Sequence, residues 1–141
     1  MIFREATMAD IRALSEIRLS VKENVLSDPG KVTHEMYVDY LSGSGKGWLC
    51  EIDGEVAGFS VASLRDASIW ALFVRPGYEG RGIGTRLLNL ATGWLFDMGA
   101  SRITLSTGVN TRADRVYESL GWKRGEINPD GEVRYQLHNP A

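Results

Sequence analysis

The sequence predicts an α/β fold in which helices interrupt a mostly antiparallel set of strands. Apolar residues alternate along several short segments, as in strands, and recur every three or four residues along others, as in helices. The predicted order is strand, helix, helix, three strands, helix, strand, helix, two strands. The chain has 141 residues, of which 43% are apolar, and this suits one domain over residues 1–141 with a substantial core.

The first predicted elements are a short strand from Ile2 to Glu5 and a helix started by a capping box of Thr7 and Asp10. The helix ends at Asp28-Pro29-Gly30, and its apolar residues follow helical spacing: Ile11, Leu14, Ile17, Val21 and Val25. A weaker helix spans His34 to Leu41. The glycine- and serine-rich segment from Ser42 to Gly47 is then expected to be a flexible loop.

Three strands follow this segment. The first alternates Trp48, Cys50 and Ile52 with other residues, and Asp53-Gly54 is a strong hairpin signal. The returning strand runs from Val56 to Ser63. After a turn at Arg65-Asp66, the central strand runs from Ile69 to Val74.

The rest of the chain predicts two helices and three strands. A long helix ends near Gly99 and has its apolar residues at helical spacing: Ile83, Leu87, Leu88, Ala91, Trp94, Leu95 and Met98. A strand from Ile103 to Ser106 leads to a short helix around Tyr117. The last two strands, Trp122 to Ile127 and Val133 to Leu137, pair across Asn128-Pro129-Asp130-Gly131.

A glycine-rich turn connects the central strand to the long helix. It contains Glu79-Gly80-Arg81-Gly82-Ile83-Gly84-Thr85. Such a turn presents backbone N–H groups at the positive end of a helix dipole, which is a suitable site for a phosphate or pyrophosphate. The segment lacks the Gly-Lys-Ser/Thr of a P-loop, and Leu87 stands where a dinucleotide fingerprint has a third small residue.

A second motif lies downstream, from Asn110 to Trp122. Asn110 is a good N-cap, and Gly121 is expected to end the helix in the left-handed conformation. Four apolar residues share one face of the helix between them: Ala113, Val116, Tyr117 and Leu120.

Together the two motifs resemble those of the GNAT acyltransferases. The glycine turn is similar to the family's pyrophosphate motif, Gln/Arg-x-x-Gly-x-Gly/Ala, with Glu79 replacing the first residue. The second motif resembles Asn-x-x-Ala-x-x-x-Tyr-x-x-x-Gly-Phe/Trp position for position. The resemblance covers nearly the whole chain, beginning at Phe3-Arg4-Glu5-Ala6-Thr7.

This resemblance implies a sheet in which the central strand and the strand after the long helix run parallel and splay apart. It also implies acetyl-CoA as co-substrate, with no metal. The implied cofactor-binding residues are Leu72, Phe73, Val74, Glu79, Gly80, Arg81, Gly82, Ile83, Gly84, Thr85 and Asn110. Tyr117 is the implied general acid, although its position also suits a core aromatic residue. Asn110 is equally compatible with a helix cap and a pantetheine contact.

The implied function is N-acetylation of a primary amine, expected to be a small molecule, by direct attack on acetyl-CoA. Two alternatives are a non-catalytic acyl-CoA-binding regulatory module and a protein or peptide N-acetyltransferase. Many relatives carry a glutamate on the central strand, where this chain has Ser68 and Ile69. The general base is therefore expected to be a water molecule, helped by Glu23, Glu35 or Asp66. The acceptor is left open.

Composition limits the partners. The net charge of −2, with no polybasic block, argues against nucleic acid and anionic membranes. Cys50 is the one cysteine, which excludes an intrachain disulfide and a cysteine-rich metal site. No apolar run approaches the roughly 20 residues of a membrane span, and the N-terminus does not resemble a signal peptide. The expected location is cytoplasmic, and a homodimer is a possibility that the family suggests.

Overall fold

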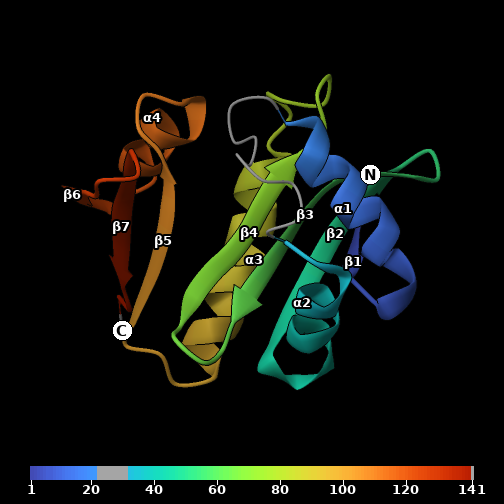
Figure 1. Ribbon diagram of the computed structural model, residues 1–141, viewed down its shortest axis with the longest axis horizontal. Coiled ribbons are helices and arrows are strands. Elements are labelled where there is room, and N and C mark those ends of the chain that lie inside the picture. The colour runs from blue at the N-terminus through green and yellow to red at the C-terminus, as the bar shows by residue number, and fades with distance from the viewer. Residues whose placement is uncertain (22–31, 141) are drawn as a thin grey trace.

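The computed structural model describes residues 1–21 and 32–140, which form a seven-stranded sheet with helices on both faces (Figure 1). The strand order is β1-β2-β3-β4-β5-β7-β6, and of these neighbours β4 and β5 are parallel while the rest are antiparallel. The strands are β1 (Ile2–Glu5), β2 (Gly45–Ile52), β3 (Glu55–Ser63), β4 (Ser68–Val74), β5 (Arg102–Gly108), β6 (Lys123–Ile127) and β7 (Glu132–His138). The predicted mixed, mostly antiparallel sheet is confirmed.

The sheet separates the core into two layers, and helices cover each of them. The helices are η1 (Met8–Asp10), α1 (Ile11–Ser20), α2 (His34–Asp39), the π-helical turn η3 (Tyr40–Ser44), α3 (Ile83–Asp97) and α4 (Arg112–Ser119). The apolar face of α3 packs on one side of the sheet, while α1 and α2 pack on the other against Phe59, Val61 and Phe73 (Figure 1). No helix in the described part of the chain is long and apolar enough to cross a membrane.

The parallel strands β4 and β5 meet at one end and then separate. Their register contains one pair, Ser68 with Thr104, and the Thr104 N–H donates to the Ala67 carbonyl at 3.1 Å. Beyond this point β5 pairs with β7 along its whole length instead. The edge of β4 from Ile69 to Val74 is therefore open toward β5, and the expected splay is confirmed.

A β-bulge in β4 changes which side chains face which layer. Val61 pairs with Ala71 and Ala62 pairs with Ile69, so Trp70 is the extra residue. An extra residue shifts the alternation of side chains along a strand. Ile69 accordingly belongs to the core on the α3 side, whereas Trp70, Ala71 and Phe73 all pack on the α1–α2 side.

The prediction of a flexible loop from Ser42 to Gly47 is wrong. Ser42 to Ser44 belong to η3, and Gly45 to Gly47 are the first residues of β2, paired with β3. A Cβ on Gly45 would lie 2.0 Å from the Ala62 carbonyl oxygen, so glycine is required there for the strands to approach. The glycines that suggested a loop instead allow close strand pairing.

The first helix begins as predicted but ends earlier. The Asp10 carboxylate accepts a hydrogen bond from the Thr7 N–H at 2.7 Å, and this capping pair starts the 3-10 turn η1, which leads into α1. The helix ends at Ser20, and Val21 is extended, with φ −84° and ψ 112°. The prediction that Val21 belongs to this helix is therefore wrong. Val25 and the predicted stop at Asp28-Pro29-Gly30 lie outside the described residues.

Candidate active site

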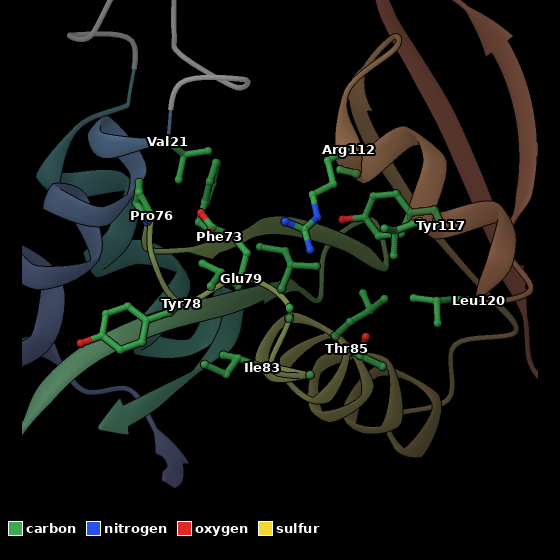
Figure 2. Close-up of a pocket in the computed structure, with 18 residues that line it drawn as sticks. Val21, Phe73, Pro76, Tyr78, Glu79, Ile83, Thr85, Arg112, Tyr117 and Leu120 are labelled. Carbon is green, nitrogen blue, oxygen red and sulfur yellow. The ribbon is translucent and has the colours of Figure 1, made fainter. Parts of the chain in front are cut away.

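A cavity of about 630 Å³ lies between the open edge of β4, the glycine turn and α4 (Figure 2). This volume is typical of small-molecule sites. The lining residues come from three segments: Leu72 to Val74 on β4; Pro76, Tyr78, Glu79, Gly80, Gly82 to Thr85 and Leu88 on the turn and α3; and Arg112, Ala113, Val116, Tyr117 and Leu120 on or just after α4. Val21 completes the wall. The splay of the sheet is what leaves room for this cavity.

The glycine turn presents the N-terminus of α3 to the cavity. Gly80 and Gly82 have φ values of 79° and 81°, in the left-handed region that glycine adopts without strain. Gly82 is the N-cap, and the first turn of α3 contains no acidic residue. The first N–H groups of a helix have no partner within the helix and lie at the positive end of its dipole. The turn can therefore bind a phosphate group.

Two charged side chains line the cavity near this turn. The Glu79 carboxylate accepts a hydrogen bond from the Gly77 N–H at 3.0 Å, so the turn itself holds it. Arg112 extends from α4 into the cavity, and its Nη2 would lie 3.9 Å from a Cβ placed on Gly80 (Figure 2). The guanidinium thus bridges α4 and the glycine turn, where it can contact an anion bound by the backbone N–H groups.

Tyr117 is the buried residue of the α4 wall. It is 7% exposed, and its ring packs against Trp122 and Tyr135 at centroid distances of 5.9 and 5.5 Å. Figure 2 shows the side chain extending from α4 toward the cavity, with its hydroxyl on the side of Arg112. Burial, with a smaller effect of Tyr135, raises the pKa of the Tyr117 hydroxyl above its ordinary value. The hydroxyl therefore stays protonated at neutral pH and can donate.

A buried carboxylate fixes α4 to the sheet. Arg124 Nε and Nη2 lie 3.1 and 3.2 Å from the two Asp114 carboxylate oxygens, and the Tyr135 hydroxyl lies 2.6 Å from Oδ1. Arg124, followed by Tyr135, holds the pKa of the Asp114 carboxyl well below its usual range, although burial opposes this. Tyr117 lies one helical turn further along α4, so this network determines where its ring is placed.

The predicted N-cap of this helix is wrong. Thr111 is the N-cap, since its side-chain oxygen accepts a hydrogen bond from the Asp114 N–H at 3.2 Å. Asn110 precedes it in the left-handed region, with φ 64°, and its own N–H donates to Asp114 Oδ2 at 2.9 Å. Both residue types favour caps, and the left-handed turn at Asn110 shifts the start of the helix by one residue. Gly121 ends the helix with φ 92°, as predicted.

Most of the predicted site residues line the cavity: Leu72, Phe73, Val74, Glu79, Gly80, Gly82, Ile83, Gly84, Thr85 and Tyr117. Arg81 and Asn110 are not among the lining residues. Arg81 is exposed and lies over the Tyr78 ring at 5.2 Å, and Asn110 is exposed at the start of α4. Arg86, another cation of this segment, lies over the Phe3 ring.

Several lining residues, most clearly Arg112 and Val21, were not predicted from the sequence. Ala113, Val116 and Leu120 were assigned with Tyr117 to one apolar face, and that face does exist. It lines the cavity, with Tyr117 packed into the core and Val116 and Leu120 37% and 38% exposed. The apolar face of this short helix was the sequence feature that could have indicated a cavity wall. No sequence pattern distinguished Arg112 from an ordinary surface arginine.

Two of the three candidate bases, Asp66 and Glu35, are not among the residues that line the cavity. Asp66 accepts a hydrogen bond from the Ser68 hydroxyl at 2.6 Å, at the end of β4 where β4 still pairs with β5. Asp66 lies in the turn before β4, and the four strand steps from Ser68 to Leu72 alone span about 13 Å at about 3.3 Å per residue. Glu35 is exposed in the first turn of α2, and Glu23 lies outside the described residues. Within residues 1–21 and 32–140, no cluster of three or more potential metal ligands was found.

Comparison with known proteins assigns the family. The model of the acetyltransferase (GNAT) family matches residues 11–122, which include the glycine turn and all of α4. This chain belongs to the GNAT acetyltransferase family, as the two sequence motifs indicated.

Relatives and solved structures agree with this assignment. An uncharacterised N-acetyltransferase of Methanocaldococcus jannaschii is 32% identical over 57% of this chain and 40% of its own length. An uncharacterised N-acetyltransferase of Mycobacterium tuberculosis is 31% identical over 62% of this chain and 56% of its own length. The chain therefore spans about half the length of these two relatives. An aminoglycoside N(6')-acetyltransferase of Stenotrophomonas maltophilia is 26% identical over 87% of the chain and 86% of that protein.

Among solved structures, the PaiA N-acetyltransferase of Thermoplasma acidophilum in complex with coenzyme A superposes with a TM-score of 0.83. It is 16% identical, and 98% of each chain is covered. The ribosomal-protein-alanine N-acetyltransferase of Brucella melitensis gives a TM-score of 0.78 at 18% identity, covering 99% of this chain and all of that one. At these identities the likeness concerns the fold.

Proposed function

We propose that this protein is an acetyl-CoA-dependent N-acetyltransferase that acts on the primary amine of a small molecule. The observation that carries the proposal is the single cavity shared by the glycine turn, the open edge of β4 and the buried hydroxyl of Tyr117. A phosphate site, a strand edge and a proton donor are the three features that acyl transfer from a thioester of coenzyme A requires.

The cavity fits acetyl-CoA in the chemistry of its walls. The amides of Gly82 to Thr85 would hold the pyrophosphate, with Arg112 contributing a positive charge. The unpaired main-chain groups of β4 from Leu72 to Val74 would hydrogen-bond an extended pantetheine arm, as a strand edge does when it accepts another strand. When bound, acetyl-CoA supplies the acetyl group as a thioester.

The residues of the chain then have three tasks in the transfer. They align the amine with the thioester, which removes much of the entropic barrier. A backbone N–H of β4 near Leu72 to Val74 stabilises negative charge on the carbonyl oxygen. Tyr117 gives the proton at Oη to the departing thiolate sulfur and is reprotonated through water by the proton that the attacking nitrogen loses as the amide forms, so that free thiol and the acetylated amine are the products.

The amine must also lose a proton before it attacks. With a typical amine pKa near 10, only about one molecule in a thousand is unprotonated at neutral pH. Strand β4 carries no carboxylate, and the position of Asp66 makes it a poor base for this site. We propose that water accepts the proton and that the carboxylate of Glu23 or Glu35 assists it as a base.

The test is thiol release from acetyl-CoA in the presence of a panel of amines, with the acetylated product identified by mass spectrometry. An enzyme of the proposed kind releases thiol only when a suitable amine is present. A regulatory module would bind CoA in calorimetry without turnover, and a peptide N-acetyltransferase would respond to peptide N-termini and not to small amines. Either of these outcomes would replace the proposed function.

A further inference from the structure

A cation with two buried donors that find no partner among the described residues lies on the α1–α2 side of β4. Arg18, near the end of α1, places its guanidinium carbon 5.1 Å from the ring centroids of both Trp70 and Phe73. Its Nε and Nη1 are inaccessible to solvent and have no hydrogen-bond partner anywhere in the described part of the chain. Buried donors on a charged group are costly when unpaired, so these nitrogens favour an anionic ligand.

A second unpartnered donor lies beside it. Tyr37 on α2 is 1% exposed, and its hydroxyl has no hydrogen bond of good geometry with the described residues, although it lies within reach of the Arg18 guanidinium. Its ring packs edge-on against Trp70 at 5.1 Å. Burial raises the pKa of this hydroxyl while the positive charge of Arg18 opposes the rise, as expected for two neighbouring groups. The two donors therefore flank Trp70 together.

This pair borders the candidate active site. The bulge at Trp70 places both Trp70 and Phe73 on the side of α1, where they hold the guanidinium by its faces. Phe73 also lines the cavity, as does Val21, which follows Arg18 by three residues. Arg18 itself does not line the cavity, so an amine bound near Leu72 to Val74 would reach its guanidinium once the Phe73 side chain between them moves aside.

We propose that Arg18 and Tyr37 bind a carboxylate of the acceptor, so that the substrate is an amine that also carries a carboxylate, such as an amino acid. This inference rests on the proposed function. Guanidinium donors in a planar fork match the two oxygens of a carboxylate, and the tyrosine hydroxyl adds a third donor. The same positive charge disfavours polycationic acceptors such as polyamines and aminoglycosides.

The experiment compares matched acceptor pairs that differ only in the carboxylate: phenylalanine and phenethylamine, leucine and isoamylamine, glutamate and 4-aminobutyrate, lysine and cadaverine. Binding to the CoA-saturated protein is measured by calorimetry, and kcat/KM by thiol release. In every pair except glutamate and 4-aminobutyrate the decarboxylated amine has no carboxylate, and for the best of these three pairs we expect the wild type to prefer the amino acid at least tenfold. Arg18→Met, which keeps length and apolar packing, should reduce that preference tenfold to a hundredfold by weakening binding of the amino acid alone.

Three further variants separate binding from folding. Tyr37→Phe should reduce the preference for the amino acid by a smaller factor than Arg18→Met does. Arg18→Lys keeps the positive charge but not the planar guanidinium, and should retain more of this preference than Arg18→Met. Arg12→Met, on the same helix with a side chain 93% exposed, should leave it unchanged. Unaltered CoA affinity in each variant shows that the site remains folded.

The outcomes for the inference and for the proposed function are distinct. Equal or better binding of the amines that lack a carboxylate, or a preference that survives Arg18→Met, would overturn the carboxylate site and leave the acetyltransferase intact. Absence of thiol release with every amine would reject the proposed function, while calorimetry would still decide whether Arg18 binds a carboxylate. Acetylation confined to peptide N-termini would overturn the assignment of an amino acid as acceptor.

Discussion

Tyr117 combines two properties that sequence reasoning left as alternatives. It is buried among aromatic rings, as a core residue would be, and it also lines the cavity. The two are compatible because the ring packs on Trp122 and Tyr135 while the hydroxyl lies at the cavity wall. Burial also raises its pKa, which keeps the proton in place until negative charge develops beside it.

Replacing Tyr117 with Phe is the corresponding test at the scale of one residue. The change keeps the ring and its packing, so we expect kcat to fall by roughly 10²–10⁴ with CoA affinity little altered. Because the pKa of Tyr117 is raised, the wild-type kcat should show no loss from its deprotonation below about pH 10, the ordinary tyrosine value. Steady-state kinetics of the wild type and the variant, measured across pH, test both the fall in kcat and its pH dependence. A variant with wild-type turnover would leave Tyr117 a structural residue.

At the scale of elements, two local structures determine the shape of the site. The glycine turn places the N-terminus of α3 at the cavity, and the Asp114 network attaches α4 to β6 and β7 on the opposite wall. Each depends on one residue whose replacement has a definite physical cost.

Gly82→Val tests the turn. Gly82 has φ 81°, which a β-branched residue adopts only with strain, so the amides at the start of α3 would be displaced. Loss of at least one charge-assisted hydrogen bond should weaken CoA binding by roughly tenfold to a hundredfold in calorimetry. Gly93→Ala, in the interior of the same helix with open space around it, is the control and should bind CoA normally. Unchanged affinity in Gly82→Val would rule out the turn as the phosphate site.

Asp114→Asn tests the attachment of α4. It removes the charge that Arg124 and Tyr135 contact, and should lower the free energy of unfolding by about 2 kcal/mol at pH 7. Because the folded pKa of Asp114 is lowered, its contribution is complete above the unfolded value of about 3.9 and is lost as pH falls below it. Urea unfolding should therefore show the difference from wild type shrinking in acid.

The exposed neighbour Glu118 provides the control for this change. It lies on the same helix, 4.0 Å from Arg124, and its side chain is 61% exposed. Glu118→Gln should change stability by less than about 0.5 kcal/mol. If it destabilised the protein as much as Asp114→Asn, the special role of the buried carboxylate would be contradicted.

At the scale of the whole molecule, the sheet consists of two parts that meet at one parallel pair. Strands β1 to β4 form one part and β5 to β7 the other, and Ser68 with Thr104 is the pair that joins them. A ligand lying along the open edge of β4 would replace the missing strand contacts between them.

Saturating CoA should therefore stabilise the protein, by about 2.7 kcal/mol at a hundred times the dissociation constant. In hydrogen exchange, we expect the added protection to be concentrated in Leu72 to Val74, the start of α3 and α4. The paired strands β1 and β2 serve as the internal reference. Uniform protection, or protection absent from the β4 edge, would contradict the proposed position of the cofactor.

The sequence by itself determined the order of the elements, the glycine turn at the start of α3 and the helix that carries Tyr117. These features are local, because periodicity, positive-φ glycines and strand-to-helix turns depend on residues close together in the chain. The resemblance to the family's motifs predicted the splay of the parallel strands. The same local rules misassigned Gly45 to Gly47, because the need for glycine there comes from Ala62, a residue distant in sequence.

Only the tertiary structure decided which surfaces meet across the cavity. It shows that the apolar face of α4 lines a cavity, that Arg112 reaches the glycine turn, and that a bulge in β4 places Trp70 and Phe73 around Arg18. Each of these depends on strand register and on packing between segments far apart in the chain. Side-chain identity alone does not encode them, because an arginine is a solvated charge on one surface, whereas Arg18 has buried donors that find no partner among the described residues.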